Sequence, residues 1–365
     1  MKKIALLTLP PKENYGGILQ AYALQAFLQE LGHSVELIDL RKRNRSLAKD
    51  AIKFLLNRTP GQNIGNYRSK FVREQVLWPF IDSVFSSRSP PLRGDDELSE
   101  YFHKIGFDYI VVGSDQVWRY KYGRDYFPNF FVNFSVPRST KKLAFSASFG
   151  LPYWEKQSLC GEVSKYLSDF QFISVRESDG VRVCKESFGV NGVRHTVDPT
   201  LLHTDGFYRS VCKNEPQNKI KLAYYVLDQN DAVVKLLRRI SDGLQLKNAD
   251  LKEFGHYHSA TVHDDTVEAW LAHFRDADHI VTDSFHGMVF SIIFRKQFYV
   301  LINNARGSSR FYSLLEYLDL TERAIDPLEP TDELCLDDID YSVVDGKLRM
   351  LVESTKSDFE SALRM

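Results

Sequence analysis

The sequence lacks the features that mark secreted, membrane-spanning or zinc-binding chains. Its few cysteines have no paired spacing, so neither a disulfide framework nor a zinc site is indicated; they are Cys160, Cys184, Cys212 and Cys335. No apolar stretch approaches the roughly 20 residues that a membrane helix needs. The first apolar run ends at Pro10 and Pro11, short of a signal peptide. We therefore expect a cytoplasmic protein whose contact with a membrane, if it has one, is peripheral.

An excess of charge of one sign is also missing. The 47 Lys and Arg residues nearly balance 48 Asp and Glu residues, which gives a formal net charge of −1. Because nonspecific nucleic-acid binding needs a basic face, we expect no nucleic-acid partner. The sequence has neither a Gly-x-Gly-x-x-Gly run nor a Walker loop, so no dinucleotide or nucleoside triphosphate is indicated. One short basic run, Arg41–Arg45, is either a solvated face or a contact for an anionic lipid or a polyprenyl diphosphate.

What is present is an alternation of short apolar runs with amphipathic segments, which predicts an α/β fold. A chain of 365 residues can form two domains that each bury a core. We place the first domain at residues 1–205, the second at 206–345 and a C-terminal helix at 346–365. Strands are expected at 4–8, 35–39, 107–112, 143–149, 170–175 and 193–197 in the first domain, and at 219–227, 279–282 and 298–302 in the second.

The stretch from Asp278 to Arg310 reads as strand, polar turn, helix, strand and arginine-bearing loop. Asp283 and Ser284 are good N-cap residues, so a helix should begin at His286 or just before it and offer backbone N–H groups to an anion. His286 is the side chain of this turn that exchanges a proton near neutral pH. Ligands of open α/β sheets bind beyond the carboxyl ends of strands, where this turn falls. The alternative is a purely structural turn, in which the polar residues only cap the helix.

A second glycine-bearing turn lies near the amino terminus. Asn14-Tyr15-Gly16-Gly17 is expected to form a loop between the first strand and a helix over residues 18–31. Gly16 and Gly17 would let backbone N–H groups approach a ligand, although glycines often serve only the turn.

A third turn follows the strand expected at 107–112. Its Asp115 and Gln116 suit hydrogen bonds to sugar hydroxyls, and the indole of Trp118 suits a sugar ring. The alternative is a capped turn in which Trp118 is buried.

Six segments of the chain resemble polysaccharide pyruvyl transferases and occur in the same order. They are NYGGILQAYAL (14–24), GSDQVW (113–118), SASFG (146–150), SVRE (174–177), DPTL (198–201) and TDSFHG (282–287). The resemblance implies two Rossmann-like domains facing a central cleft, as in GT-B glycosyltransferases, with the acceptor on the first domain and the donor on the second. It also implies transfer of pyruvate from phosphoenolpyruvate to a sugar hydroxyl pair, as a cyclic ketal, in capsule or exopolysaccharide biosynthesis.

On this resemblance His286 is the expected acid and Asp283 or Asp115 the expected base. Many members carry an arginine at the position of Ser284, so the donor's phosphate and carboxylate need cations from elsewhere. The expected donor-binding residues are Ser284, Gly287, Arg306, Arg310, Arg176 and Asn14. The expected acceptor-binding residues are Asp115, Gln116, Trp118, Gly16 and Gly17.

The resemblance implies no metal and no cofactor beyond the donor substrate. The expected acceptor is a galactose, on a polysaccharide or on a polyprenyl-diphosphate-linked precursor at the inner face of the membrane. Two other functions stay open: a sugar-nucleotide glycosyltransferase of the same fold, and a non-catalytic partner in glycan assembly that tolerates loss of His286. The sequence indicates no oligomeric state.

Overall fold

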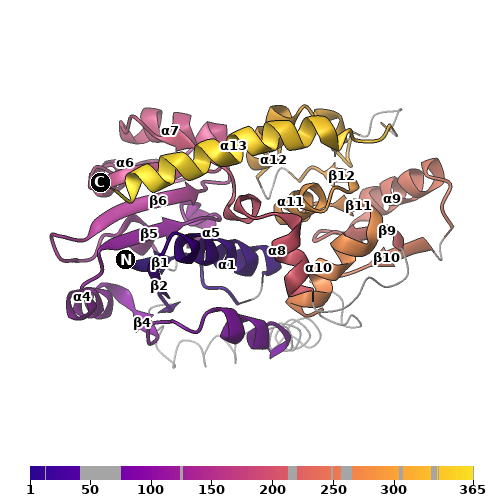
Figure 1. Ribbon diagram of the computed structural model, residues 1–365. Helices are drawn as coiled ribbons and strands as arrows, with labels where there is room; N and C mark the ends of the chain where they lie inside the picture. Colours follow the sequence, from indigo (N-terminus) through magenta and orange to yellow (C-terminus); the bar gives the residue numbers. More distant parts are fainter. Residues whose placement is uncertain are drawn as a thin grey trace, which may run out of the picture. The chain divides into compact units, whose positions relative to one another are not determined.

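The computed structural model describes residues 1–12, 14–41, 75–123, 126–212, 220–247, 250–255, 265–303, 307–329, 335 and 337–364. The chain divides into two compact units (Figure 1): unit 1 contains Met1–Pro199 and Ser357–Met365, and unit 2 contains Thr200–Lys356. The division falls earlier than residue 205, because the hydroxyl of Tyr208 donates to the carbonyl of Thr200 at 2.7 Å. The ring of Tyr208 also packs edge-on against Phe290, 4.9 Å away, so this segment belongs with unit 2.

Unit 1 contains a parallel sheet with the strand order β2-β1-β5-β6-β7-β8. The strands are β1 (Lys3–Leu7), β2 (Ser34–Leu37), β5 (Tyr109–Gly113), β6 (Lys141–Ala147), β7 (Phe170–Val175) and β8 (Arg194–His195). A small parallel pair joins β3 (Leu40–Arg41) to β4 (Leu92–Arg93). The strand expected at 193–197 is shorter than predicted.

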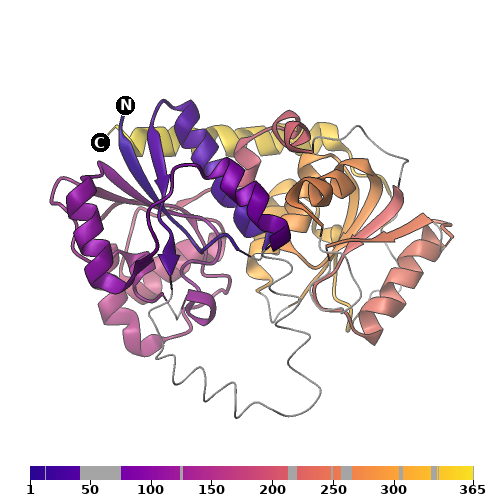
Figure 2. The same cartoon turned by 90° about the horizontal axis from the view of Figure 1, so that it is seen from below.

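Helices cover both faces of this sheet (Figure 2). They are α1 (Tyr15–Glu30), α4 (Gly94–Ile105), α5 (Tyr120–Gly123), α6 (Cys160–Leu167) and α7 (Ser178–Phe188), with η1 (Asn129–Phe131), η2 (Gln157–Leu159) and helical residues 75–84. On one face Leu7 shares a core with Phe102 of α4 and Phe188 of α7. On the other, Leu6 and Leu24 of α1 meet at Gly113. Burial on both faces explains why the strands read as continuous apolar runs.

Unit 2 contains a second parallel sheet, in the order β10-β9-β11-β12-β13. Its strands are β9 (Ile220–Tyr225), β10 (Leu251–Glu253), β11 (Ala277–Thr282), β12 (Gln297–Leu301) and β13 (Ala324–Ile325). The helices are η3 (Pro199–Leu202), α8 (Asp205–Val211), α9 (Asp231–Gly243), α10 (Val267–Asp276), α11 (Phe285–Ile293), α12 (Ser309–Leu318) and η6 (Thr321–Arg323). Leu236 of α9 packs on one face of the sheet. Trp270 of α10 packs edge-on against both Tyr225 and Phe290. The expected class, two Rossmann-like α/β units, is confirmed.

The last helix, α13 (Tyr341–Ala362), begins before the expected position, because Tyr341 is anchored by a hydrogen bond from its hydroxyl to the carbonyl of Lys296. Its final turns belong to unit 1, where the ring of Phe359 lies 4.4 Å from that of Phe145. Within the described residues, no helix combines the length and apolar character needed to cross a bilayer.

Each sheet has one place where the strand order changes direction. In unit 1 the chain runs from β1 to β2 on one side and later continues from β5 on the other. In unit 2 it runs from β9 to β10 on one side and then continues from β11 on the other. Ligands of open α/β sheets bind beyond the carboxyl ends of the strands at such switch points. We therefore expect ligand-binding residues in the turns after β1, β5, β9 and β11.

Candidate functional site

Asp283 joins the two strands at the switch point of unit 2. One carboxylate oxygen accepts the N–H of Leu227 at 2.7 Å, and the other accepts the N–H of Asp228 at 3.0 Å. The neighbouring Thr282 hydroxyl donates to the carbonyl of Tyr225 at 2.7 Å, which adds a second link between the same strands. Both oxygens of Asp283 accept backbone N–H groups, so this side chain holds the turn in position. The geometry therefore argues against the expected role of Asp283 as the base.

The polar turn after Asp283 starts a helix, as predicted. Ser284 is the N-cap of α11, and its hydroxyl accepts the N–H of Gly287 at 3.3 Å. His286 lies in the first turn, only 4% exposed, with its ring 5.5 Å from that of Phe285. A hydroxyl and an imidazole therefore lie together at the positive end of the α11 dipole, where negative charge is favoured.

Gly287 allows α11 to lie directly against β11. A Cβ atom placed on Gly287 would meet the Oγ1 atom of Thr282 at 2.3 Å and its Cβ at 3.0 Å. Thr282 cannot easily move away, because its hydroxyl donates a hydrogen bond to the carbonyl of Tyr225 and accepts one from the N–H of Ser284 at 3.0 Å. A larger residue at position 287 would push the His286 turn away from the strand.

Replacing Gly287 with alanine is therefore expected to destabilise unit 2 by roughly 1–3 kcal/mol, the usual cost of overpacking. Urea unfolding of the full chain measures this change. Gly346→Ala is the matched control, since Gly346 lies in α13 and a Cβ atom added to it would meet no described atom within 4 Å. That substitution should stabilise the protein by roughly 0.4–1 kcal/mol. Equal unfolding midpoints for Gly287→Ala and the wild type would show that the helix and strand have room to separate.

Arg310 is the described member of the expected arginine loop, and it lies in the first turn of helix α12 instead. Its guanidinium is buried, 5.4 Å from the ring centre of Phe285, and Phe285 in turn contacts His286. The cation is therefore one aromatic ring away from the imidazole. Arg306 lies outside the described residues.

Two further polar residues lie at this switch point, although no role was expected for either of them. The side-chain amide of Asn303 donates to the carboxylate of Asp228 at 2.8 Å. Both residues come shortly after strands, β9 and β12, and polar residues at strand ends are the signal that could have found them.

In unit 1, Asn14 is the N-cap of α1 and accepts the N–H of Gly16 at 3.0 Å. The helix consequently begins at Tyr15, and the expectation of a loop through Gly17 is wrong. A Cβ placed on Gly17 would lie 3.6 Å from the Oδ2 atom of Asp115. The structure thus brings Asn14, Gly16, Gly17 and Asp115 together at the switch point between β1 and β5.

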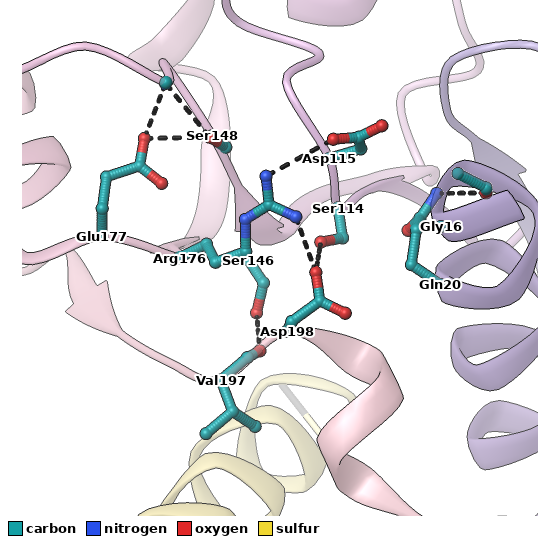
Figure 3. Close-up of polar contacts among 12 residues, drawn as sticks. Gly16, Gln20, Ser114, Asp115, Ser146, Ser148, Arg176, Glu177, Val197 and Asp198 are labelled. Atoms are coloured by element: carbon teal, nitrogen blue, oxygen red, sulfur yellow. Dashed lines mark hydrogen bonds and ion pairs between the residues drawn. The ribbon is translucent and has the colours of Figure 1, made fainter. Parts of the chain in front are cut away.

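Arg176 lies between two carboxylates behind this turn (Figure 3). Its guanidinium donates to Asp198 at 2.6 Å and to Asp115 at 3.4 Å, and all three side chains are buried. Burial alone would lower the pKa of Arg176, but the two aspartates reverse the effect and the pKa is raised. The guanidinium of Arg176 therefore forms a buried ion-pair network with Asp115 and Asp198. This geometry argues against the expected donor-binding role of Arg176.

Glu177 supports the backbone around Asp115 and was given no role from the sequence. Its Oε1 atom accepts the N–H groups of Phe149 and Gly150, at 2.7 and 2.9 Å. The same atom accepts the hydroxyl of Ser148 at 3.0 Å (Figure 3). The N–H of Ser148 in turn donates to the carbonyl of Asp115 at 3.0 Å. Burial raises the pKa of Glu177, although Arg176 opposes this shift. Its position shortly after β7, at the carboxyl end of a strand, is the sequence feature that could have indicated a role for Glu177.

Trp118 does not offer a surface to a sugar. Its indole is 1% exposed, donates to the carbonyl of Phe130 at 3.0 Å, and stacks on Phe131 with ring centres 5.5 Å apart. The expected acceptor-binding role is therefore wrong for this residue. Gln116 is also buried, and its side-chain oxygen accepts from Arg119 at 2.8 Å. Both residues build the turn that presents Asp115.

The described part of the chain holds no group of three or more His, Cys, Asp or Glu side chains that could bind a metal ion. The polar groups that do converge are hydroxyls, backbone N–H groups and an imidazole in unit 2, and a carboxylate beside a helix start in unit 1. Such groups suit proton transfer and the binding of anionic or hydroxyl-rich ligands.

A family model for polysaccharide pyruvyl transferases matches residues 14–305. The chain belongs to this family. The match contains both switch points, including the Asn14 cap, the turn at Asp115 and the turn from Thr282 to Gly287. No curated protein matches the chain in sequence.

Several solved structures of sugar-nucleotide proteins are similar in outline. The UDP complex of MnaA from S. aureus is 13% identical, with coverage of 98% of this chain and 90% of that chain and a TM-score of 0.49. The UDP-GlcNAc 2-epimerase from Methanocaldococcus jannaschii is 11% identical, with coverage of 96% and 93% and a TM-score of 0.48. An α-glucosyltransferase in complex with UDP is 8% identical, with coverage of 98% and 94% and a TM-score of 0.48. These likenesses are too remote to assign a ligand.

Proposed function

We propose that this chain transfers pyruvate from phosphoenolpyruvate to a pair of sugar hydroxyls and forms a cyclic ketal. Membership of the polysaccharide pyruvyl transferase family supports this reaction class. The observation that carries the assignment to particular residues is the turn of unit 2, where Ser284 caps α11 and His286 lies in its first turn. Galactose, in a polysaccharide or lipid-linked precursor of a cell-surface glycan, is the acceptor we propose.

The donor is assigned to unit 2. Phosphoenolpyruvate carries a phosphate and a carboxylate, which are costly to desolvate without compensating charge or hydrogen bonds. The start of α11 supplies a helix dipole, and Ser284 supplies a hydroxyl where many members of the family have an arginine. Arg310 supplies a nearby cation through the Phe285 contact. This set replaces the family arginine in our proposal, with Arg306 as a further candidate.

His286 is proposed as the acid. It gives a proton to the methylene carbon of phosphoenolpyruvate, which becomes a methyl group and leaves a positive charge on the carbon that bears the phosphate. A sugar hydroxyl attacks that carbon and loses its proton. Phosphate then leaves, and the second hydroxyl closes the ring and loses its own proton. Every step is a proton transfer or a displacement, so we propose no cofactor beyond the donor.

The acceptor is assigned to unit 1, on the carboxylate of Asp115. This side chain lies at the start of α1, and its second oxygen faces Gly17. A carboxylate there can accept a proton from a sugar hydroxyl, which is the role that the geometry of Asp283 disfavours. We further propose that the protein works in the cytoplasm, at the inner face of the membrane when the acceptor is lipid-linked.

One incubation tests the function directly. The purified chain is mixed with phosphoenolpyruvate and a panel of galactosides, free and lipid-linked, and the products are read by mass spectrometry alongside inorganic phosphate release. We expect a galactoside that gains pyruvate less one water, with one phosphate released per ketal. A parallel incubation replaces phosphoenolpyruvate with sugar nucleotides. Transfer of a sugar there, with no ketal in the first incubation, would identify a glycosyltransferase and overturn the proposal.

A further inference from the structure

Unit 1 has a second feature at the carboxyl edge of its sheet, a pocket beside the exposed indole of Trp78. Pro10, Pro11 and Lys12 line it after β1, and residues 37–39 and Arg41 line it at and after the end of β2. Trp78 and Ile81 come from helical residues 75–84, and Arg88 completes the rim. Apart from Arg41, the described residue of the basic run, none of these residues was expected to contact a ligand.

The rim of this Trp78 pocket is held in place by the sheet. The N–H of Leu37 donates to the carbonyl of Ser87, and the N–H of Ser89 donates to the carbonyl of Leu37, both at 3.0 Å. These bonds fix Arg88 beside the end of β2. Ile81 is buried, which anchors the helical segment that carries Trp78. A ligand would therefore meet a largely preformed surface, which lowers the entropic cost of binding.

The aromatic part of the pocket suits a sugar ring. Trp78 is 39% exposed, in contrast to the buried Trp118. The Arg88 guanidinium lies 5.0 Å from the centre of its ring, an arrangement that stabilises both groups. Pro10 and Pro11 add apolar surface next to it. An indole with an accessible apolar body and flanking prolines can pack against the C–H groups of a pyranose.

The charged part of the pocket suits an anion. Among its lining residues, Lys12, Arg41 and Arg88 are set against a single carboxylate, Asp39, which pairs with Arg41 at 2.6 Å. Arg88 in turn pairs with Asp82 on the same helical segment as Trp78. The Nε atom of Arg41 is buried without a hydrogen-bond partner among the described residues, so this guanidinium retains an unused donor. The guanidinium of an arginine can donate two parallel hydrogen bonds to two oxygens of one phosphate.

We infer that the Trp78 pocket binds a phosphorylated carbohydrate, with the sugar ring against Trp78 and the phosphate on Arg41 and Arg88. The ligand class follows from the pocket's own residues. The further statement that this ligand is the phosphate-bearing end of the acceptor rests on the proposed function. The pocket then takes the place of Trp118 as the aromatic contact of unit 1.

Binding to the full-length chain, measured by calorimetry without phosphoenolpyruvate, tests the inference. The probes are galactose 1-phosphate, methyl galactoside and inorganic phosphate, followed by a polyprenyl-diphosphate-linked galactose in detergent. We expect galactose 1-phosphate to bind more tightly than either of its parts. Tighter binding of the lipid-linked probe would identify a lipid carrier as the source of the phosphate, and equal binding would identify a soluble sugar phosphate.

Variants then locate the site. Arg88→Ala is expected to weaken binding of galactose 1-phosphate roughly tenfold or more, since a charged hydrogen bond contributes about that factor. Trp78→Ala is also expected to weaken binding, because it removes the apolar surface on which the sugar ring packs. Tyr153→Ala removes an aromatic ring of unit 1 that is 58% exposed, and Arg182→Ala removes an exposed arginine of unit 1; neither should change binding. Should Trp78→Ala fail to fold, Trp78→Tyr retains a ring and Arg88→Ala carries the test.

The inference is overturned if the wild-type protein binds no phosphorylated sugar. It is also overturned if the pocket variants bind galactose 1-phosphate as tightly as the control variants do. Because no turnover is involved, these results are separate from those of the proposed reaction. Binding that depends on Trp78 together with an absence of ketal formation would keep the pocket and remove the pyruvyl transfer.

Discussion

Replacing His286 with glutamine is expected to lower turnover by at least about a hundredfold and to leave the fold intact. A positioned proton donor contributes roughly 10²–10⁴ to a rate. Glutamine retains a similar shape and a hydrogen-bonding end, but it cannot deliver a proton. The fold should persist because the elements that hold the turn, Asp283 and the Ser284 cap, are unchanged.

Phosphate release and ketal formation at saturating substrates measure this change. His279→Gln is the matched control, since His279 lies on β11 of the same unit but before the turn. Its turnover should stay within a few fold of the wild type. If His286→Gln is folded by circular dichroism and turns over at the wild-type rate, His286 is a structural residue of the helix start and the acid must be sought elsewhere.

The architecture was largely predictable because the strands are buried on both faces. A strand of this kind reads as an uninterrupted apolar run, and β7 was predicted with its observed ends, Phe170 and Val175. The helix start at Ser284 was also predictable, because N-capping depends on neighbouring residues alone. The same local rule, applied to Asn14, would have placed the start of α1 at Tyr15.

The roles of individual polar residues were less predictable, because they depend on partners from distant strands. Trp118 and Trp78 look alike in sequence, yet the first is covered by Phe131 and the second stays partly exposed. From its position at a strand end, Arg176 was expected to bind the anionic donor. Its main ion-pair partner, Asp198, lies 22 residues further along the chain. No local pattern contains that information.

The two switch points use an aspartate in different ways. In unit 2 both oxygens of Asp283 hold the backbone after β9, which leaves the neighbouring helix start and His286 as the reactive part. In unit 1 the backbone around Asp115 is held by Ser148, and its carboxylate is paired with Arg176 at the longer distance of 3.4 Å. Because of this difference, we propose that Asp115 accepts the proton of the acceptor hydroxyl. The structural role of Arg176, which pairs with Asp115, can be tested by its effect on the stability of unit 1.

Replacing Arg176 with alanine is expected to destabilise unit 1 by roughly 3–5 kcal/mol, because it removes one partner of a buried ion pair and leaves charge uncompensated. The side chain of Arg176 is 1% exposed and that of Asp198 is fully buried, so water cannot replace the lost cation. Amide hydrogen exchange of peptides from β6 and β7 measures the opening of this unit, and peptides from β11 and β12 of unit 2 provide an internal reference.

The control for this substitution is Arg182→Ala, on the same unit. Arg182 pairs with Asp179 and Glu186 on the surface of α7, where its side chain is 49% exposed. Exposed pairs of this kind contribute at most about 1 kcal/mol, so exchange in β6 and β7 should barely change. A large loss of protection in Arg176→Ala, confined to unit 1, would establish the structural role. If both variants retain wild-type protection while Arg176→Ala alone binds phosphoenolpyruvate more weakly, the cation is a donor ligand after all, and the ion pairs with Asp115 and Asp198 contribute little to the fold.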